Sequence, residues 1–356
     1  MQVIFRVDSS KNIGSGHVIR CLRIANKLRD KSADCGFICK ELSGSLIKLI
    51  KDQGFKVFLL SQEIKMPNKN SSIIVDKLFN WKTDALQTAE ILKNLQTNTL
   101  IVDHYGIDKK WEDYQKPYCK KIMAIDDLDN RKHSVDIILD QNLFPNIQKR
   151  YLKNSNKNCR KFIGLEYAFL DPNFIKKRKL IRRQKKEVSK IFIYLGNTGS
   201  SNILRRILKV FIDNSLNKFK IEVIFTGDAE EKNKIINLSR NHKFIKILDT
   251  QPNLADIMSS ADLSIGAGGL TTWERIYLGL PSAVITVADN QKECSEYLNS
   301  LGLIWLIGHH DQVDDNKITD DIKKILSSEN LIDFSKRCLS VNVGTKSSEV
   351  INEILV

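Results

Sequence analysis

A lone histidine near the start of the chain is the first side chain that could transfer a proton. His17 follows an apolar segment, residues 3–7, and a loop ending in Gly14-Ser15-Gly16, and it begins a stretch with helical spacing. In open α/β sheets, ligands bind beyond the carboxyl ends of strands, where the next helix offers free N–H groups. The positive end of the helix dipole disfavours the imidazolium form, and a neutral ring can accept a proton. We therefore predict that His17 acts as a general base, against the alternative that it only packs or caps at the helix start.

A second group of candidate residues follows an apolar segment in the C-terminal half. Residues 265–275 read Ile-Gly-Ala-Gly-Gly-Leu-Thr-Thr-Trp-Glu-Arg, and residues 288–291 read Ala-Asp-Asn-Gln. Glycines let the backbone approach a ligand, and N–H groups and hydroxyls at a helix start could hold a diphosphate without a metal. Glu274, on the first turns of that helix, can accept two hydrogen bonds from a ribose diol. A tight packing turn would explain the glycines, but not the glutamate, the hydroxyls and the Asp-Asn-Gln run together.

Strands and helices alternate along the chain and must position both groups. Strand-like segments are 3–7, 35–39, 56–60, 99–103, 121–125, 136–139, 190–195, 220–225, 244–247, 262–265 and 282–285. Helical patterns cover 16–29, 45–53, 82–95, 108–116, 201–214, 230–240, 254–259, 269–278 and 291–301. In the first helix, Val18, Cys21 and Leu22 fall on one face, and Arg20 is expected to point elsewhere. Such alternation predicts parallel sheets with right-handed crossovers.

A charged break at 176–187 divides this alternation into two series. We expect a Rossmann-like domain over 1–172 that carries the His17 loop, a basic linker over 173–187, and a second Rossmann-like domain over 188–313 that carries the glycine run. Residues 314–356 read as further helices that pack back on the domains. Two doubly wound domains facing a central cleft are the expected architecture.

The composition of the chain limits the kinds of binding partner that we expect. An apolar content of 42% is ordinary for a globular protein, and neither an N-terminal signal peptide nor an apolar run long enough to span a bilayer is found, so we expect no membrane insertion. Seven cysteines, an odd number without a C-x-x-C pair, favour a reducing cytoplasm and argue against a zinc site. The net charge of +14 includes a basic cluster at 176–186, but no aromatic residues interleave with it, so we expect no nucleic acid and assign it to a solvated linker helix. We expect a monomer.

Two other groups of polar residues are interpreted as ordinary loop residues. Asp127-Leu128-Asp129 superficially matches the D-x-D metal site of nucleotide-sugar transferases, but it follows a strand in the N-terminal half, and we expect ordinary loop carboxylates and no metal. His309-His310 lies between a glycine and an aspartate and is expected in a solvated turn.

Ordered motifs in both halves carry a resemblance to a known family. These motifs are Phe5-Arg6-Val7-Asp8-Ser9-Ser10 with Ile13-Gly14-Ser15-Gly16-His17, Asp103-His104-Tyr105-Gly106, Tyr167-Ala168-Phe169-Leu170, and the runs at 266–275 and 289–291. The chain resembles the UDP-sugar hydrolases of pseudaminic acid biosynthesis, which remove UDP from a 2,4-diacetamido-2,4,6-trideoxy-altrose. The C-terminal run is shared with glycosyltransferases that use UDP-sugars, whereas the Asp-His-Tyr-Gly run and the His17 loop discriminate. One departure is Gly196-Asn197, where the family commonly has a glycine pair, although Asn also adopts left-handed conformations.

The resemblance implies an α/β, GT-B-like fold and a metal-independent attack of water on the anomeric carbon, with inversion and without a cofactor. It implies that His17 is essential for the chemistry; Asp103 and Tyr105 are candidates for a polar shell around water or sugar. The residues expected to bind the UDP-linked diacetamido trideoxy sugar are Arg6, Asp8, Gly14, Gly16, Gly196, Asn197, Gly268, Gly269, Thr271, Thr272, Glu274, Asn290 and Gln291. Two alternatives stay open: a glycosyltransferase that moves a sugar from UDP to a hydroxyl acceptor, and a sugar-nucleotide binding module without catalysis.

Overall fold

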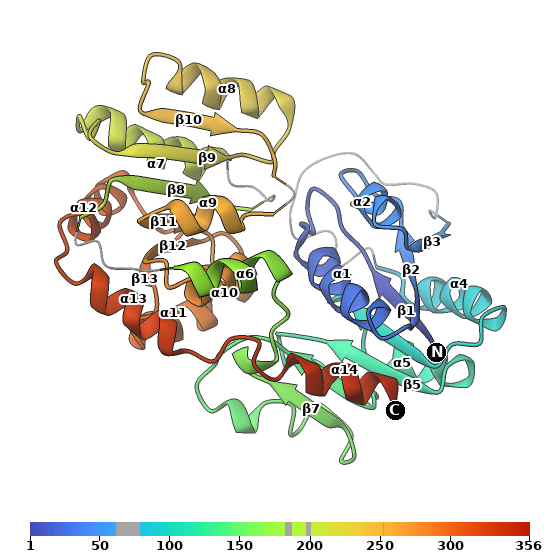
Figure 1. Cartoon of the computed structure of the whole chain (residues 1–356). Helices are drawn as coiled ribbons and strands as arrows, with labels where there is room; N and C mark the ends of the chain where they lie inside the picture. The colour runs from blue at the N-terminus through green and yellow to red at the C-terminus, as the bar shows by residue number, and fades with distance from the viewer. Residues whose placement is uncertain (62–78, 182–186, 197–200, 252) are drawn as a thin grey trace. The chain divides into compact units, whose positions relative to one another are not determined.

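The chain folds into two compact units, each built around one parallel sheet. The computed structural model describes residues 1–61, 79–181, 187–196, 201–251 and 253–356 (Figure 1). The first unit combines Met1–Phe169 with Gly344–Val356, and the second contains Leu170–Val343. All strand pairs in both sheets are parallel, which confirms the α/β fold class expected from the alternation of strands and helices.

The sheet of the first unit has seven strands in the order β3-β2-β1-β4-β5-β6-β7. These strands are β1 (Gln2–Val7), β2 (Asp34–Lys40), β3 (Lys56–Leu60), β4 (Thr99–Asp103), β5 (Lys121–Ile125), β6 (Ile137–Asp140) and β7 (Arg160–Ile163). The helices that cover the sheet are α1 (Gly16–Arg29), α2 (Ile47–Asp52), α4 (Trp81–Lys93), α5 (Lys109–Gln115) and α14 (Ser347–Leu355). The strand order reverses between β1 and β4, so the carboxyl ends of these strands form the topological switch point where such sheets bind ligands.

Side chains of β1 alternate between the two faces of this sheet. Val3, Phe5 and Val7 pack in a cluster with residues of α1, α2 and α14, whereas Ile4 packs in a cluster with residues of α4 and α5. Arg6 follows the same alternation as Ile4, and it reaches an aspartate of α4. The period of the strand therefore sends a charged side chain into a buried face, where it needs partners.

The sheet of the second unit has six strands in the order β10-β9-β8-β11-β12-β13. They are β8 (Lys190–Tyr194), β9 (Lys220–Ile224), β10 (Ile245–Leu248), β11 (Leu263–Gly266), β12 (Ser282–Thr286) and β13 (Trp305–His309). The helices are α6 (Pro172–Leu180), α7 (Ser201–Asp213), α8 (Ala229–Ser239), α9 (Ala255–Ser260), α10 (Thr271–Tyr277), α11 (Lys292–Ser300), α12 (Asp315–Leu326) and α13 (Leu331–Ser340). This sheet reverses its order between β8 and β11, so its switch point lies where Gly196 and the glycine run follow those strands.

Most predicted elements form within a few residues of their expected ends, and the differences have local causes. Helix α6 forms at 172–180, inside the expected linker, because Phe174 is buried with residues of the second unit. Helix α14 belongs to the first unit, where Val350, Ile351 and Ile354 are buried beside α1. Strands β7 and β13 are short edge strands with charged or glycine residues, and the sequence pattern did not predict them.

Candidate active site

His17 contacts the carboxylate at the end of β4. Its Nδ1 lies 2.5 Å from Oδ1 of Asp103, because β1 and β4 pair side by side with Val7 opposite Asp103, and α1 begins at the same edge of the sheet. Asp103 is 1% exposed and His17 is 8% exposed, so the histidine is the member of the pair that water can reach. A carboxylate at Nδ1 favours a proton on that nitrogen and leaves Nε2 as an acceptor. Asp103, expected to lie in a polar shell around water or sugar, is buried in contact with His17 and Arg20.

Arg20 binds the same carboxylate from the next turn of α1. Its Nε donates to Oδ2 of Asp103 at 2.5 Å and its Nη2 to Oδ1 at 2.6 Å, and Nη1 reaches Oδ2 of Asp127 at 3.2 Å. Burial alone would raise the pKa of Asp103, but the charge of Arg20 and the hydrogen bonds with Arg20 and His17 outweigh it and hold that pKa well below its usual range. The expectation that Arg20 points away from the buried face was wrong, because a long side chain at position i+3 reaches the acid that His17 contacts.

Tyr105 lies edge-on to His17 at the loop after β4. The two ring centroids are 4.7 Å apart at an interplanar angle of 81°. Burial raises the pKa of the Tyr105 phenol, and the charge of Asp127 adds to this effect. Tyr105 therefore keeps its proton and can act as a hydrogen-bond donor, but not as a base.

Arg6 and Asp8, expected to contact ligand, lie in a buried ion network. Nη1 and Nη2 of Arg6 donate to the two oxygens of Asp8 at 2.7 and 2.8 Å, and Nε and Nη2 donate to Asp84 at 3.1 and 2.6 Å. Lys40, whose side chain is partly exposed, adds an ion pair to Asp84 at 2.9 Å. Because Arg6 is 0% exposed and these carboxylates engage all three of its nitrogens, the network ties the end of β1 to α4.

His104 is held neutral beside this network. The backbone N–H of Gly106 donates to its Nδ1 at 3.0 Å, so its own proton is on Nε2, which lies 3.5 Å from Oδ2 of Asp8. Burial lowers the pKa of His104 to about 4, although Asp8 opposes the shift. His17, not His104, is therefore the histidine whose free nitrogen is suited to accept a proton.

The glycines before His17 shape the loop between β1 and α1. Gly14 has a φ of +85° and its N–H donates to the carbonyl of Ser10 at 2.9 Å, so this position favours glycine. A side chain at Gly16 would meet no atom within 4 Å. The open space at Gly16 leaves the start of α1 accessible at the backbone level.

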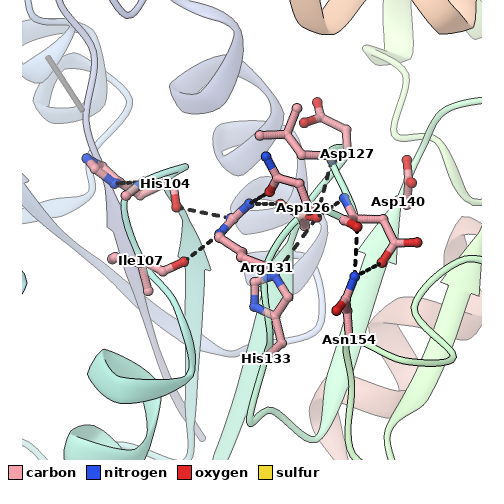
Figure 2. A network of polar contacts seen from close by, with 12 residues as sticks. His104, Ile107, Asp126, Asp127, Arg131, His133, Asp140 and Asn154 are labelled. Atoms are coloured by element: carbon pink, nitrogen blue, oxygen red, sulfur yellow. Dashed lines mark hydrogen bonds and ion pairs between the residues drawn. The ribbon is translucent and has the colours of Figure 1, made fainter. Parts of the chain in front are cut away.

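Carboxylates at the ends of β5 and β6 extend the network of the first unit. Arg131 pairs with Asp126 at 2.6 Å and donates to the carbonyls of His104 and Ile107 (Figure 2). The two aspartates of the D-x-D run serve protein donors: Asp127 accepts from Arg20, and Asp129 accepts from the backbone of Tyr151 and from Asn154. These contacts favour the structural interpretation of the D-x-D run.

Tyr151 lies between Asp126 and Asp140. Its hydroxyl lies 3.0 Å from Oδ2 of Asp126 and 3.1 Å from Oδ2 of Asp140. A phenol has one proton, so it can donate fully to one of these carboxyl groups at a time. Burial raises the pKa of Asp140 to about 7, although Arg150, whose Nε lies 2.9 Å from Oδ2 of Asp140, opposes the shift.

In the second unit, Arg275 lies beneath the glycine run. Its Nη2 donates to the carbonyl of Ala267 at 2.5 Å and to Oγ1 of Thr272 at 2.9 Å, and an added Cβ at Gly266 would lie 1.6 Å from its Nη1. Its buried Nε has no hydrogen-bond partner among the described residues. Burial lowers the pKa of Arg275 to about 10, so the group stays cationic at neutral pH. A buried cation under this run raises the local potential in favour of an anion.

Gln291 lies over the same run. Its Oε1 accepts from the N–H of Gly268 at 3.2 Å and from the N–H of Val287 at 3.0 Å. These two bonds direct the amide nitrogen of Gln291 away from the loop backbone, and an added Cβ at Gly269 would lie 3.6 Å from it. The amide nitrogen can therefore donate to an acceptor near Gly269. Asn290 is exposed beside it.

The remaining expected ligand residues lie around the same switch point. Thr271 is half-buried at the start of α10, whereas Thr272 is buried and its hydroxyl donates to Ala267 at 3.2 Å, so Thr272 stabilises the loop from inside. Glu274 is buried near Tyr194, where burial and the charge of Glu274 raise the pKa of the Tyr194 phenol to about 12. Gly196 has a φ of +81° and open space at its Cβ position. Asn197 lies outside the described residues.

Comparisons with known proteins agree with this architecture. Residues 190–337 match the glycosyltransferase family 28 C-terminal domain. MurG of Acinetobacter baumannii superposes with a TM-score of 0.66 over 99% of both chains at 13% identity. The chain has a GT-B fold. Among the described residues of this GT-B chain, none of the helices has the length and apolarity needed to cross a membrane.

Two curated relatives extend over most of the GT-B chain. The UDP-2,4-diacetamido-2,4,6-trideoxy-beta-L-altropyranose hydrolase of Campylobacter jejuni is 29% identical over 85% of this chain and 97% of its own length. An uncharacterized protein of Methanocaldococcus jannaschii is 28% identical over 85% of this chain, and the match spans 59% of that longer protein. The first of these matches confirms the resemblance that the motifs indicated.

Sequence reasoning missed three side chains of these two sites. Arg20 lies one turn after His17 in the helix. Its position at i+3 from the candidate base was a signal, but the helical pattern led us to expect Arg20 at the surface. Arg275 directly follows Glu274 in the helix predicted over 269–278, and its charge next to a candidate ligand residue was the signal. Asp84 carried no local signal, because its partner Arg6 is 78 residues away in the sequence.

Proposed function

We propose that this chain is a metal-independent nucleotide-sugar hydrolase that releases UDP from UDP-2,4-diacetamido-2,4,6-trideoxy-beta-L-altropyranose, a step of pseudaminic acid biosynthesis. Water attacks the anomeric carbon and inverts its configuration. The Campylobacter relative, named for this hydrolysis, and the matching motifs of both halves support this substrate.

The observation that carries the proposal is the contact of His17 with Asp103, which Arg20 fixes from the same face of α1. Oδ1 of Asp103 lies 2.5 Å from Nδ1 of His17, and Arg20 donates to both oxygens of the same carboxylate. The carboxylate can then neither rotate nor take up a proton near neutral pH, because its pKa lies well below the usual range owing to Arg20 and His17, against the effect of burial. This arrangement keeps Nε2 of His17 as the proton acceptor.

The proposed step needs one base and no acid. The water oxygen forms a bond to the anomeric carbon while one water proton passes to Nε2 of His17. The bond between that carbon and the β-phosphate oxygen breaks, and its electron pair leaves with UDP. A phosphate monoester has a second pKa of about 6, so UDP departs as an anion without a proton from the enzyme. The protonated His17 then returns the proton to solvent.

The glycine run of the second unit supports the binding of the departing charge. Arg275 lies beneath Gly266 and Ala267 and places a positive charge next to the loop. The amide nitrogen of Gln291 supplies a further donor near Gly269. Glu274 is the acid of this site that suits a ribose diol.

A second candidate function is transfer of the sugar from UDP to a hydroxyl acceptor. The match of residues 190–337 to a glycosyltransferase domain and the similarity to MurG favour it. The same base would then take a proton from an acceptor hydroxyl in place of water. The chemistry at His17 is common to both functions, so the acceptor decides between them.

One experiment separates these functions. Purified full-length chain is incubated with the UDP-linked diacetamido sugar in the presence of EDTA, and UDP release and the anomeric NMR signals are followed with time. The hydrolase releases UDP without an added acceptor, and the first sugar product has the opposite anomeric configuration. Release only after addition of an acceptor would identify a transferase, and tight binding without release a binding module. Either result would overturn the proposed hydrolysis.

A further inference from the structure

Two histidines and an aspartate converge where β13 ends at the edge of the second sheet. Consecutive side chains of a strand point to opposite faces, so His309 and His310 would diverge if the strand continued. The strand instead ends in a turn, in which the N–H groups of Gln312 and Val313 donate to the carbonyl of His309 at 2.9 and 3.1 Å. As a result, one ligand atom each from His309, His310 and Asp311 lies within 4.8 Å of the others. The expectation of a solvated turn was wrong for His309, which is the last residue of β13 and is buried.

A neighbouring strand fixes the ring of His309. Its Nδ1 lies 2.8 Å from Oγ1 of Thr286 on β12, and Thr286 is buried as well. The other ring nitrogen, Nε2, therefore faces Oδ1 of Asp311 at 3.5 Å and Oδ1 of Asp289 at 3.9 Å. A metal-binding histidine typically has its second nitrogen held in this way, because the outer contact sets the tautomer and the ring orientation.

One pair of ligand atoms in this group already has a separation close to that around a small tetrahedral cation. Two ligand atoms that each lie about 2.0–2.1 Å from a tetrahedral ion are separated by about 3.3 Å. The separation of 3.5 Å between Nε2 of His309 and Oδ1 of Asp311 is close to this value without any rearrangement. The side chains of His310 and Asp311 are half-buried and exposed, so they can rotate by the small amount that closes the set. Asp289 is paired with Lys292 at 2.7 Å, which leaves the fourth position of such an ion to water.

We propose that His309, His310 and Asp311 form a binding site for a transition-metal dication such as Zn²⁺. Two imidazole nitrogens and one carboxylate oxygen suit Zn²⁺, whereas Mg²⁺ and Ca²⁺ prefer sets of oxygen ligands. The proposal does not depend on the hydrolase activity, since the proposed reaction routes no step through a metal. The site joins the end of β13 to residues 286–289, and bound metal therefore stabilises the segment that leads into Asn290 and Gln291.

The test uses the full-length chain without a polyhistidine tag, because a tag would bind the same metals. The protein is dialysed against a chelator and then titrated with Zn²⁺ by isothermal titration calorimetry, with Mg²⁺ as the control ion. Co²⁺ is added to a second sample, because its visible absorption reports tetrahedral coordination. We expect about one Zn²⁺ per chain, an increase in Tm on addition of Zn²⁺, and no response to Mg²⁺.

Matched variants locate the binding. His310→Ala and Asp311→Asn change side chains at the surface of the turn and should each weaken Zn²⁺ binding at least tenfold. His242→Ala removes a half-buried histidine of the same unit and should bind Zn²⁺ as the unchanged chain does. Absence of Zn²⁺ binding to the unchanged chain would contradict the site. So would Zn²⁺ binding by His310→Ala and Asp311→Asn that is as tight as binding by the unchanged chain. Hydrolysis of the UDP-sugar in EDTA has no bearing on this outcome, so failure of one proposal leaves the other testable.

Discussion

Arg20 and His17 hold the same carboxylate from one face of one helix. Arg20 donates to both oxygens of Asp103 at 2.5 and 2.6 Å, and Nδ1 of His17 contacts one of these oxygens at 2.5 Å. Helical spacing of three residues puts both side chains on the same side of α1, and β4 presents Asp103 to that side. The base, its orienting acid and the cation that fixes the acid therefore come from two elements that meet at the switch point of the first sheet.

Replacement of His17 tests the base directly. His17→Asn keeps a polar side chain of similar size without a basic nitrogen, and we expect kcat to fall by about 10²–10⁴-fold. Binding of UDP, measured by calorimetry, should change little because the second unit carries the nucleotide site in this proposal. The matched control is His242→Asn, which should keep full activity. Retention of normal turnover by His17→Asn would falsify the assignment.

Replacement of Arg20 tests the role of a residue that acts through another. Without the two-point contact of Arg20, the pKa of Asp103 should rise. Burial disfavours the charged carboxylate, and the hydrogen bond with His17 would be the main contact that still favours it. In Arg20→Lys, which keeps a charge but loses the two-point contact that fixes Asp103 against His17, kcat should therefore fall while KM changes little. Lys27→Met, on the same helix, serves as the control. A higher KM with unchanged kcat would show that Arg20 does not act through Asp103.

The same substitution has a consequence for stability. A carboxyl group whose pKa is lower in the folded state stabilises the fold above its unfolded value of about 4, and this contribution is lost as the pH falls through the folded value. The difference in Tm between the unchanged chain and Arg20→Lys should thus be full at pH 7 and shrink toward pH 3. A difference that stays constant over this range would exclude the ionisation of Asp103 as its source.

The fold was largely predictable because its signals are local, whereas the buried ion networks are not. Segments such as 16–29 and 56–60 form with the expected ends, since apolar spacing and element length suffice to define them. The partners of Arg6 depend on the approach of α4, and those of Arg20 on β4, so the sequence marked these arginines only as charged residues near motifs. The edge strand β13 was missed because Gly308 interrupts its apolar run, and the burial of His309 was missed with it.

Asp140 should make the stability of the first unit depend on pH near neutrality. Burial raises its pKa to about 7, so Asp140 keeps a proton in the folded state that the unfolded chain releases near pH 4. Its contribution is fully present below about pH 4 and is lost as the pH rises through about 7, with an upper limit of about 4 kcal/mol. Asp140→Asn mimics the protonated form, so its Tm relative to the unchanged chain should rise between pH 5 and pH 8. The exposed Asp320→Asn should show no such trend. Parallel Tm curves for Asp140→Asn and the unchanged chain would mean that Asp140 does not gain or lose a proton in the folded state over this pH range.

Arg275 should determine how tightly the second unit holds a diphosphate. Its guanidinium donates to the carbonyl of Ala267 and lies against Gly266, so its positive charge lies next to the loop proposed to hold the diphosphate, with the neighbouring Glu274 as the opposing charge. Arg275→Met keeps the length of the side chain without the charge and should weaken UDP binding, measured by calorimetry, at least tenfold. It should weaken uridine binding much less, because uridine has no phosphate. Arg240→Met changes an exposed arginine of the same unit and controls for the change in net charge. Equal weakening for UDP and uridine would indicate that Arg275 only maintains the loop, and the assignment of the diphosphate to this glycine run would then fail.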